Sequence, residues 1–331
     1  MNTILISGGA GFIGSHLVEQ MLLNKKNKIV IMDNFNNFYE PALKERNIKE
    51  LFIIREKEDL DDDFLKVYRG DIRDNNFVNE VFDNNRIDIV IHLAAVCGVR
   101  PSIENPEEYY NVNVNGSLNL LEACKNRKIQ KFIFASSSSI YGNNPKVPFS
   151  ENDTVDNQIS PYAETKKVGE RLCRSYYNLN DMSVACLRFF TVYGPRQRPD
   201  LAIHKFTELI FNNQEIPFYG DGDSERDYTY IDDVIEGIIK TIEWIKQGHK
   251  KFEIFNLGES NTVSLKLMVK TLENVIGKKA IINPLPMQPG DVIRTYADIS
   301  KSRKVLGYTP KTDFQEGIVK FVDWYKEMNG L

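Results

Sequence analysis

The fold is decided by a stretch near the start of the chain, which reads Thr3-Ile4-Leu5-Ile6-Ser7-Gly8-Gly9-Ala10-Gly11-Phe12-Ile13-Gly14. Residues 3–7 predict a buried strand, and apolar residues at helical spacing follow over residues 12–23. A second apolar strand over residues 28–32 ends at Asp33, which completes a β-α-β unit. Strands and helices continue to alternate as far as Phe189. This order predicts an α/β fold with a doubly wound parallel sheet of the Rossmann type.

The glycines of this stretch predict a dinucleotide site. Gly8 permits a tight turn, Gly11 lets the backbone approach a pyrophosphate, and Gly14 lets helix and strand pack closely. The start of the following helix offers free N–H groups to the pyrophosphate charge. Asp33 ends the next strand 19 residues after Gly14, where its carboxylate can bind both ribose hydroxyls and repel a 2′-phosphate. The predicted cofactor is therefore NAD rather than NADP.

Later strands should end at the same edge of the sheet and add contacts to the cofactor. Asp71 follows the third strand, where it could meet the adenine or simply cap a helix. The small side chains after the fourth strand suit close passage of the cofactor or ordinary packing. The additional cofactor contacts expected are Phe12, Ile13, Asp71, Ile72, Leu93, Ala94 and Ala95.

Tyr162 and Lys166 form a Y-x-x-x-K pair, which lies on one face of a predicted helix over residues 160–179. A neighbouring ammonium and an oxidised nicotinamide should favour the phenolate, so we expect the pKa of Tyr162 to fall from its usual value of about 10. Tyr162 would then be a general base toward a sugar hydroxyl, and Lys166 could also bind the nicotinamide ribose. Four serines, residues 136–139, leave the fifth strand at the same edge. One of them could relay a proton to Tyr162, or the run could cap a turn.

Composition excludes several other classes. The chain has 331 residues and a formal net charge of −4, without a basic stripe, which argues against nucleic acid as the main partner. The four cysteines and four histidines lack metal-binding spacing, so no metal is expected. No apolar run reaches the ~20 residues of a membrane helix. The N-terminus has no signal-peptide features, and we expect a cytoplasmic protein.

These motifs together resemble the extended short-chain dehydrogenases/reductases, and specifically their NAD-dependent nucleotide-sugar epimerases, over essentially the whole chain. The resemblance implies that Ser137, which lies 25 residues before Tyr162, is the catalytic hydroxyl of the serine run. The domains expected are residues 1–188 plus 225–257, which bind NAD, and residues 189–224 plus 258–331. The second, smaller α/β domain would bind the nucleotide sugar.

A finer resemblance is to UDP-glucuronate 4-epimerases, carried by residues 98–106, 136–142 and 188–200. It implies that Thr191 and Arg198 contact the sugar carboxylate, helped by Ser138 and Ser139. Oxidation of a uronate at C4 gives a β-keto acid. Such an acid loses CO₂ when the C–C bond to its carboxylate lines up with the π orbital of the ketone. Arginine and hydroxyl groups can hold that bond out of line.

The same resemblance places the uridine diphosphate in the second domain. Arg226 resembles the arginine that binds the diphosphate, and Asp291 resembles the aspartate that binds the nucleotide ribose. Gln288 stands where many relatives have an arginine, so one phosphate contact is in doubt. Arg100 and Arg196 are weaker candidates, and each could equally be a surface charge or form a structural ion pair. The family often forms homodimers through the helices that are here residues 106–127 and 160–179.

Three alternatives stay open at this point. The first is a 4-epimerase acting on UDP-glucose or UDP-N-acetylglucosamine, for which Arg198 would matter little. The second is a decarboxylase or a 4,6-dehydratase; these enzymes typically carry glutamate where this chain has Ser139, and dehydratases carry aspartate at Ser138. The third is a protein that senses NAD without catalysis, against which the presence of both Tyr162 and Lys166 argues.

Overall fold

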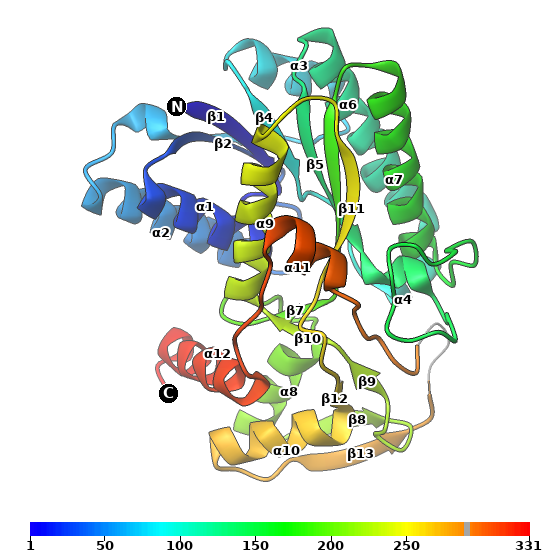
Figure 1. Ribbon diagram of the computed structural model, residues 1–331. Helices are drawn as coiled ribbons and strands as arrows, with labels where there is room; N and C mark the ends of the chain where they lie inside the picture. Colours follow the sequence, from blue (N-terminus) through cyan, green and yellow to red (C-terminus); the bar gives the residue numbers. More distant parts are fainter. Residues whose placement is uncertain (288–291) are drawn as a thin grey trace.

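The computed structural model describes residues 1–287 and 292–331. A central sheet contains seven strands in the order β11-β6-β5-β4-β1-β2-β3 (Figure 1), and all neighbouring strands are parallel. The doubly wound α/β fold is therefore confirmed. The strands are β1 Asn2–Ser7, β2 Asn27–Asp33, β3 Leu65–Arg69, β4 Ile89–His92, β5 Lys131–Ser137, β6 Ser183–Phe189 and β11 Phe252–Leu257.

Helices cover both faces of this sheet (Figure 1). On one side lie α1 (Phe12–Asn24), α2 (Pro41–Lys57) and α9 (Ile231–Lys246), and on the other α3 (Asn75–Asp83), α6 (Ser117–Asn126) and α7 (Pro161–Leu179). Side chains of a strand alternate between the faces. Ile4 and Ile6 thus pack in one core with Leu17 of α1, whereas Leu5 packs in the other with Leu120 of α6.

The helix expected over residues 106–127 is not one regular α-helix. It consists of α5 (Pro106–Tyr110), a π-helical segment (Asn111–Gly116) and α6. Asn113 in the π-helical segment accepts the N–H of Val96 at 2.9 Å, donates to the carbonyl of Val96 at 3.0 Å and donates to the Thr165 hydroxyl at 3.0 Å. The irregular turn therefore fastens the loop after β4 to α7, a use of π-helical turns that is common near functional sites.

Residues 40–63 are rich in charged side chains, yet not all of the segment is solvated surface. Most of the segment is exposed, but Lys44 and Asn47 in the first turns of α2 are buried. The Lys44 ammonium donates to the carbonyl and side-chain oxygens of Asn36, and the Asn47 amide donates to the carbonyl of Ala10. The start of α2 thus packs against the turn after β1.

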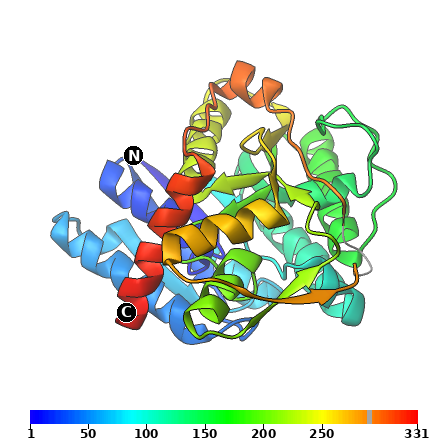
Figure 2. The ribbon, with the colours of Figure 1, turned by 90° about the horizontal axis from the view of Figure 1, so that it is seen from below.

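Most of the remaining elements lie beyond the carboxyl ends of the strands, and Figure 2 shows them from below, whereas α11 (Ser300–Leu306) packs against α9 and β11. Helix α10 packs against α8 and α12. Three two-stranded sheets pair β7 with β10, β8 with β13 and β9 with β12. The predicted division into two domains stays a prediction. The elements are α4 Val99–Glu104, β7 Thr191–Tyr193, α8 Ala202–Phe211, β8 Glu215–Tyr219, β9 Glu225–Arg226, β10 Tyr228–Tyr230, β12 Val263–Ser264, α10 Leu265–Ile276, β13 Ile281–Leu285, α11 Ser300–Leu306 and α12 Phe314–Asn329. Within the described ranges, no helix combines the length and apolar character needed to cross a bilayer.

Candidate active site

A cavity of about 480 Å³ lies at the carboxyl ends of the parallel strands. This is the position where doubly wound sheets bind their ligands. The cavity brings together most of the residues predicted from the sequence. Those on its wall are Gly8, Gly11, Phe12, Ile13, Gly14, Asp33, Ile72, Leu93, Ala94, Ala95, Ser137, Ser138, Ser139, Tyr162, Lys166, Thr191, Arg198 and Arg226.

The glycine turn is compact, because side chains at two of its glycines would collide with the backbone. Gly8 has a φ of +76°, and a Cβ at this position would lie 2.7 Å from the Ala94 nitrogen. A Cβ at Gly14 would lie 2.2 Å from the Gly8 carbonyl oxygen. Helix α1 begins after Gly11, which has no side chain to cap it, and its first residues face the cavity. The free N–H groups of that turn suit an anionic group such as a pyrophosphate.

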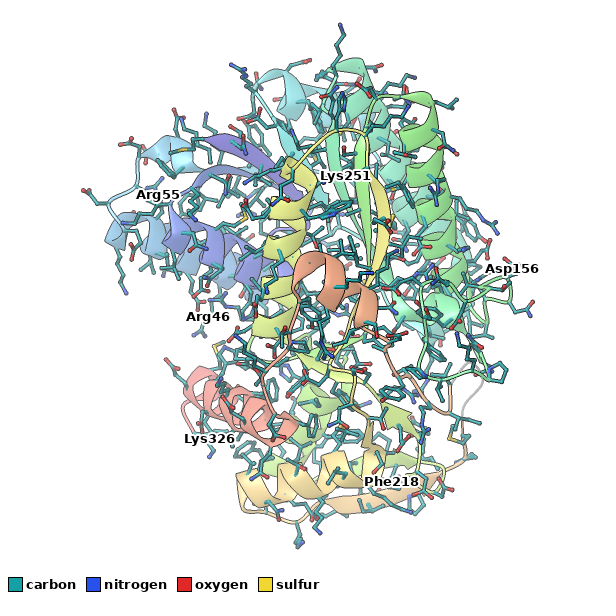
Figure 3. All side chains as sticks on the ribbon, in the orientation of Figure 1. Arg46, Arg55, Asp156, Phe218, Lys251 and Lys326 are labelled. Carbon is teal, nitrogen blue, oxygen red and sulfur yellow. The ribbon has the colours of Figure 1, made fainter. Side chains whose placement is uncertain are left out.

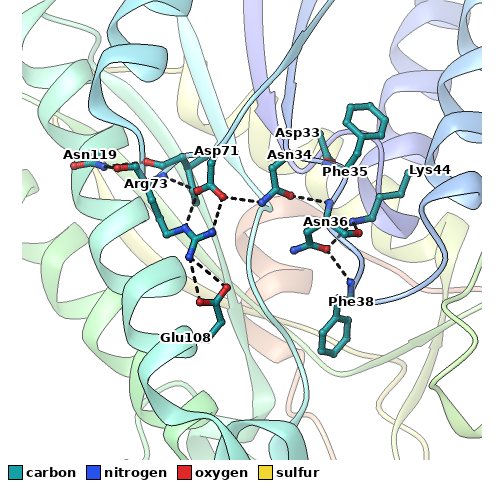
Figure 4. Close-up of polar contacts among 11 residues, drawn as sticks. Asp33, Asn34, Phe35, Asn36, Phe38, Lys44, Asp71, Arg73, Glu108 and Asn119 are labelled. Carbon is teal, nitrogen blue, oxygen red and sulfur yellow. Dashed lines mark hydrogen bonds and ion pairs between the residues drawn. The ribbon is translucent and has the colours of Figure 1, made fainter.

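Asp33 ends β2 on the cavity wall. Its carboxylate accepts the N–H groups of Ala10 at 3.1 Å and Phe35 at 2.9 Å. Burial raises the pKa of Asp33, while the Phe35 N–H group and the nearby Lys44 ammonium act in the opposite direction. Figure 4 shows Asp33 and Lys44 on either side of the loop that follows β2. The side chain is therefore fixed by backbone groups before any ligand arrives.

Three predicted residues are not on the described wall. Asp71 forms an ion pair with Arg73 at 2.9 Å and accepts a hydrogen bond from Asn34 (Figure 4). Burial acts to raise the pKa of Asp71, but the hydrogen bonds from Arg73 and Asn34, together with the Arg73 charge, lower it overall. The Arg100 guanidinium lies over the ring of Tyr219, 4.8 Å from its centroid. Asp291, like Gln288, lies outside the described residues.

The catalytic candidates meet where α7 crosses the end of β5. Ser160 caps α7 by accepting the N–H of Ala163 at 3.2 Å, which places Tyr162 in the first turn. The Ser137 hydroxyl forms a hydrogen bond with the Tyr162 hydroxyl. The Lys166 ammonium is buried and donates to the Ala135 carbonyl at 2.8 Å. A phenol, a hydroxyl and an ammonium thus share one wall of the cavity.

The expected pKa shift of Tyr162 has the opposite sign in the protein itself. Protein atoms surround its hydroxyl, and this burial raises the pKa. Cys97 also raises it, whereas the Ser137 hydrogen bond and the Arg198 charge lower it. Burial likewise lowers the pKa of Lys166. Burial disfavours the charged forms of both groups. The predicted fall in the pKa of Tyr162 includes the charge of an oxidised nicotinamide, and it stays a prediction for the protein with NAD bound.

A cation and several hydroxyl groups also line the cavity. The Arg198 guanidinium makes two hydrogen bonds to Asp200, at 2.9 and 2.8 Å. Thr191, Ser138 and Ser139 line the same cavity. The Ser139 hydroxyl is buried and has no hydrogen-bond partner among the described residues. Because buried hydroxyls are nearly always paired, this one is suited to a polar group of a ligand.

Sequence analysis missed several residues of the cavity wall. Cys97 contacts the Tyr162 hydroxyl, and its thiol donates to the Ala95 carbonyl at 3.7 Å. Its place four residues after Leu93, beyond a strand that ends at the cavity, was the available signal. Phe38, Tyr39 and Thr295 also line the cavity but come from irregular segments. No local pattern marks such positions.

The fold and the site together define the class of the short-chain dehydrogenases/reductases. The family model described as GDP-mannose 4,6 dehydratase matches residues 5–321, nearly the whole chain. The chain belongs to this family, the extended short-chain enzymes that comprise NAD-dependent epimerases and dehydratases.

Two curated relatives and one solved structure are similar to this chain over nearly its whole length. An uncharacterised protein of Methanocaldococcus jannaschii is 43% identical over 325 residues, which cover 98% of this chain and 96% of that protein. A UDP-glucuronate 4-epimerase of Thermodesulfobacterium geofontis is 40% identical over 329 residues, which cover 99% and 97%. The crystal structure of UDP-glucuronic acid 4-epimerase from Bacillus cereus, in complex with UDP-glucuronic acid and NAD, is similar with a TM-score of 0.90. That chain is 36% identical, and the match covers 98% of this chain and 99% of the other.

Proposed function

We propose that this protein is an NAD-dependent 4-epimerase that interconverts UDP-glucuronate and UDP-galacturonate through a transient 4-keto sugar. The observation that carries the proposal is that Arg198, Thr191 and Ser139 line the same cavity as Tyr162. A cation and hydroxyls close to a base suit a sugar that carries both a carboxylate and an oxidisable hydroxyl. The similarity to two UDP-glucuronate 4-epimerases supports the same substrate.

The described residues fit the cofactor. A Cβ atom at Gly8 or Gly14 would collide with backbone atoms around the turn, so its close fold needs glycine at both positions, and the first turn of α1 faces the cavity. Asp33 would accept the hydroxyls of the adenosine ribose, and its carboxylate disfavours a 2′-phosphate. Ile72, Leu93 and the two alanines that follow would form the walls around the cofactor. When bound, NAD would supply a hydride acceptor for C4 of the sugar and, once reduced, the hydride donor for the return to the opposite face of the sugar.

The protein's part in the reaction is to hold the sugar and to move one proton. Tyr162 takes the proton of the 4-hydroxyl, and Ser137, hydrogen-bonded to it, can pass that proton between the sugar and the phenol. Lys166 is held in place through the Ala135 carbonyl. Arg226 on the cavity wall would bind the diphosphate, about whose bonds the sugar turns over between the two half-reactions.

The uronate carboxylate needs a site of its own because the 4-keto intermediate can lose CO₂. Arg198 is oriented by two hydrogen bonds to Asp200, which presents its guanidinium in a fixed direction. Ser138, Ser139 and Thr191 add hydroxyl groups that can fix the carboxylate plane. The serines at positions 138 and 139 also lack the acid that the competing eliminations use, which favours epimerisation over decarboxylation and dehydration.

The proposal is tested by incubating the purified protein with UDP-glucuronate, without added NAD, and following the sugar signals by proton NMR. UDP-galacturonate at equilibrium is the expected product. A UDP-pentose with CO₂ would show a decarboxylase, and turnover of UDP-glucose or UDP-N-acetylglucosamine alone would show a neutral-sugar epimerase. Arg198→Ala should lower kcat/KM for UDP-glucuronate about 100-fold, because it removes a charge-assisted contact. An unchanged value would contradict the assignment of Arg198.

Two accompanying proposals follow from the family resemblance. We propose a homodimer formed by the helical segments 106–127 and 160–179, and we propose that the protein acts in the cytoplasm. Leu118 of α6 and Leu179 at the end of α7 are exposed in the single chain. Light scattering on the eluted peak of a sizing column measures the mass, and a monomer at micromolar concentration would refute the dimer.

A further inference from the structure

The loop that carries Arg198 is anchored by a second arginine. Arg196 lies two residues earlier, after β7, and its guanidinium contacts two helices of the opposite part of the molecule. One nitrogen lies 2.7 Å from the carboxylate of Glu19 on α1, and another lies 3.0 Å from that of Glu50 on α2. The Arg196 side chain is only 13% exposed. Arg46, on the same helix as Glu50, forms a further ion pair with Glu50, with 3.0 Å between the Arg46 Nε and the carboxylate. A partly buried, two-armed arrangement of this kind fixes a loop far better than an isolated surface pair.

The backbone of the loop indicates that this placement is specific. Arg196 has a φ of +61°, in the left-handed region that long side chains avoid. Residues held in such conformations persist only where their surroundings enforce them, and they gather at functional sites. Next to it, the Gln197 side-chain amide donates to the Val192 carbonyl at 3.2 Å, and the backbone carbonyl of Gln197 accepts from the His204 ring at 2.6 Å. The turn thus sends Arg196 to the helices, while Arg198 lines the cavity.

The helices that Arg196 contacts are those that shape the proposed cofactor site. Helix α1 begins at the glycine turn, and α2 carries Lys44 beside Asp33. The charge of Arg196 also contributes, after burial, to lowering the pKa of His16 on α1 to about 3. That histidine is therefore neutral and adds no positive charge to compete for the two carboxylates.

We propose that Arg196 is a positioning residue for recognition of the sugar carboxylate. Its pairs with Glu19 and Glu50 hold the loop of residues 194–200 against the cofactor-binding helices and so fix Arg198 relative to Tyr162. The inference rests on the proposed function, because it gives Arg198 the uronate carboxylate as its ligand. A displacement of ~1 Å at such a group can cost about 100-fold. Loss of Arg196 should therefore reduce the preference for a uronate, rather than weaken the binding of all sugar nucleotides to the same extent.

The test measures that preference directly. Calorimetry on the NAD-loaded protein, in a Tyr162→Phe background that stops turnover, gives the Kd values for UDP-glucuronate and UDP-glucose. The ratio of the UDP-glucose Kd to the UDP-glucuronate Kd should fall about tenfold in Arg196→Met. It should not fall further when Arg196→Met is added to Arg198→Met, since Arg196 acts through Arg198. The matched control is Arg55→Met, which should leave the ratio unchanged. Arg55 lies on α2 at the outer edge of the molecule (Figure 3), is 14% exposed and pairs with Asp62 at 2.7 Å.

The outcomes separate the inference from the proposed function. A preference for UDP-glucuronate that survives Arg196→Met overturns the inference and leaves the uronate assignment standing. No preference in the protein with Arg196 intact overturns both. Additive losses in the double variant would show that Arg196 acts independently of Arg198, which also overturns the inference. If Arg196→Met does not fold, Glu19→Gln and Glu50→Gln each remove one arm, and each should lower the ratio by a smaller factor.

Discussion

Replacement of Glu170 by glutamine should destabilise the protein strongly, because Glu170 is one half of a buried ion pair. Arg188 of β6 makes two hydrogen bonds to its carboxylate, both at 2.9 Å, and the two side chains are 1% and 3% exposed. The Ser136 hydroxyl also donates to Glu170, at 2.7 Å, and the Tyr141 hydroxyl lies 2.9 Å from the Arg188 guanidinium. The pair therefore joins β5, β6 and α7, which carry Ser137, Tyr162 and Lys166.

The magnitude follows from the burial. Glu170→Gln keeps the shape of the side chain but leaves the Arg188 charge buried without an anion, which costs about 3–5 kcal/mol of unfolding free energy. Replacing both partners, in Glu170→Met with Arg188→Met, removes the stranded charge. The double variant should therefore lose at least ~2 kcal/mol less than the sum of the two single losses. Glu45→Gln is the control. Its carboxylate also makes two hydrogen bonds to an arginine, Arg69, but the two side chains are 46% and 56% exposed, and its loss should be ~1 kcal/mol or less.

The assay is urea unfolding followed by circular dichroism, with the same NAD concentration in every sample because a bound cofactor adds stability. A Glu170→Gln loss no larger than that of Glu45→Gln would refute the argument. So would a double variant that loses the full sum of the single losses, since that result would mean the two charges are not coupled.

Three further outcomes are expected. Tyr162→Phe should lower turnover at least ~100-fold, with the Kd for UDP-glucuronate changed only a few-fold, and substantial remaining turnover would exclude Tyr162 as the base. Gly14→Ala should yield protein without cofactor, measured by NAD released on denaturation, because the new Cβ would lie 2.2 Å from the Gly8 carbonyl oxygen; normal NAD content would disprove this. Burial, and after it three nearby aspartates, raises the pKa of Glu259 to about 8 in the folded protein. The stabilising contribution of the protonated side chain is therefore fully present below the pKa of Glu259 in the unfolded chain, and it is lost as the pH rises through 8. Between pH 6 and 9, stability should therefore fall more in the parent than in Glu259→Gln, by up to about 2 kcal/mol since water screens this half-buried group, and parallel pH profiles would contradict this.

The sequence was most informative where function depends on strand ends. The alternation of strands and helices predicts that all parallel strands end at one edge, so Gly8, Asp33 and Ser137 had to lie near one another. The Tyr162–Lys166 pair needed only helical spacing. Each of these features is local, and the topology then gathers them without further information.

The features that the sequence did not show arise from contacts between distant segments. The π-helical turn at residues 111–116 exists because Asn113 reaches both Val96 and Thr165. Lys44 is buried because α2 packs against the turn after β1, although its surrounding sequence is charged and typical of a surface. Arg196 could equally have been a surface charge, since its partners Glu19 and Glu50 lie far away in the sequence. Neither periodicity nor motif spacing reports such pairings.

The protonation of Tyr162 is where sequence and structure combine into a mechanism. Within the protein, burial raises its pKa, and the Ser137 hydroxyl and the Arg198 charge are the groups that lower it. A uronate carboxylate bound to Arg198 would neutralise the arginine charge. Of these two groups, Ser137 alone would then still lower the pKa of Tyr162. The positive charges left beside Tyr162 would then be the Lys166 ammonium, 5.9 Å from the centroid of the tyrosine ring, and the oxidised nicotinamide that NAD would supply when bound. The phenol would thus lose its proton more readily while the nicotinamide is oxidised, and it would hold the proton more firmly once the hydride has been taken. Proton and hydride transfer would be coupled by the burial that makes this tyrosine a poor base on its own.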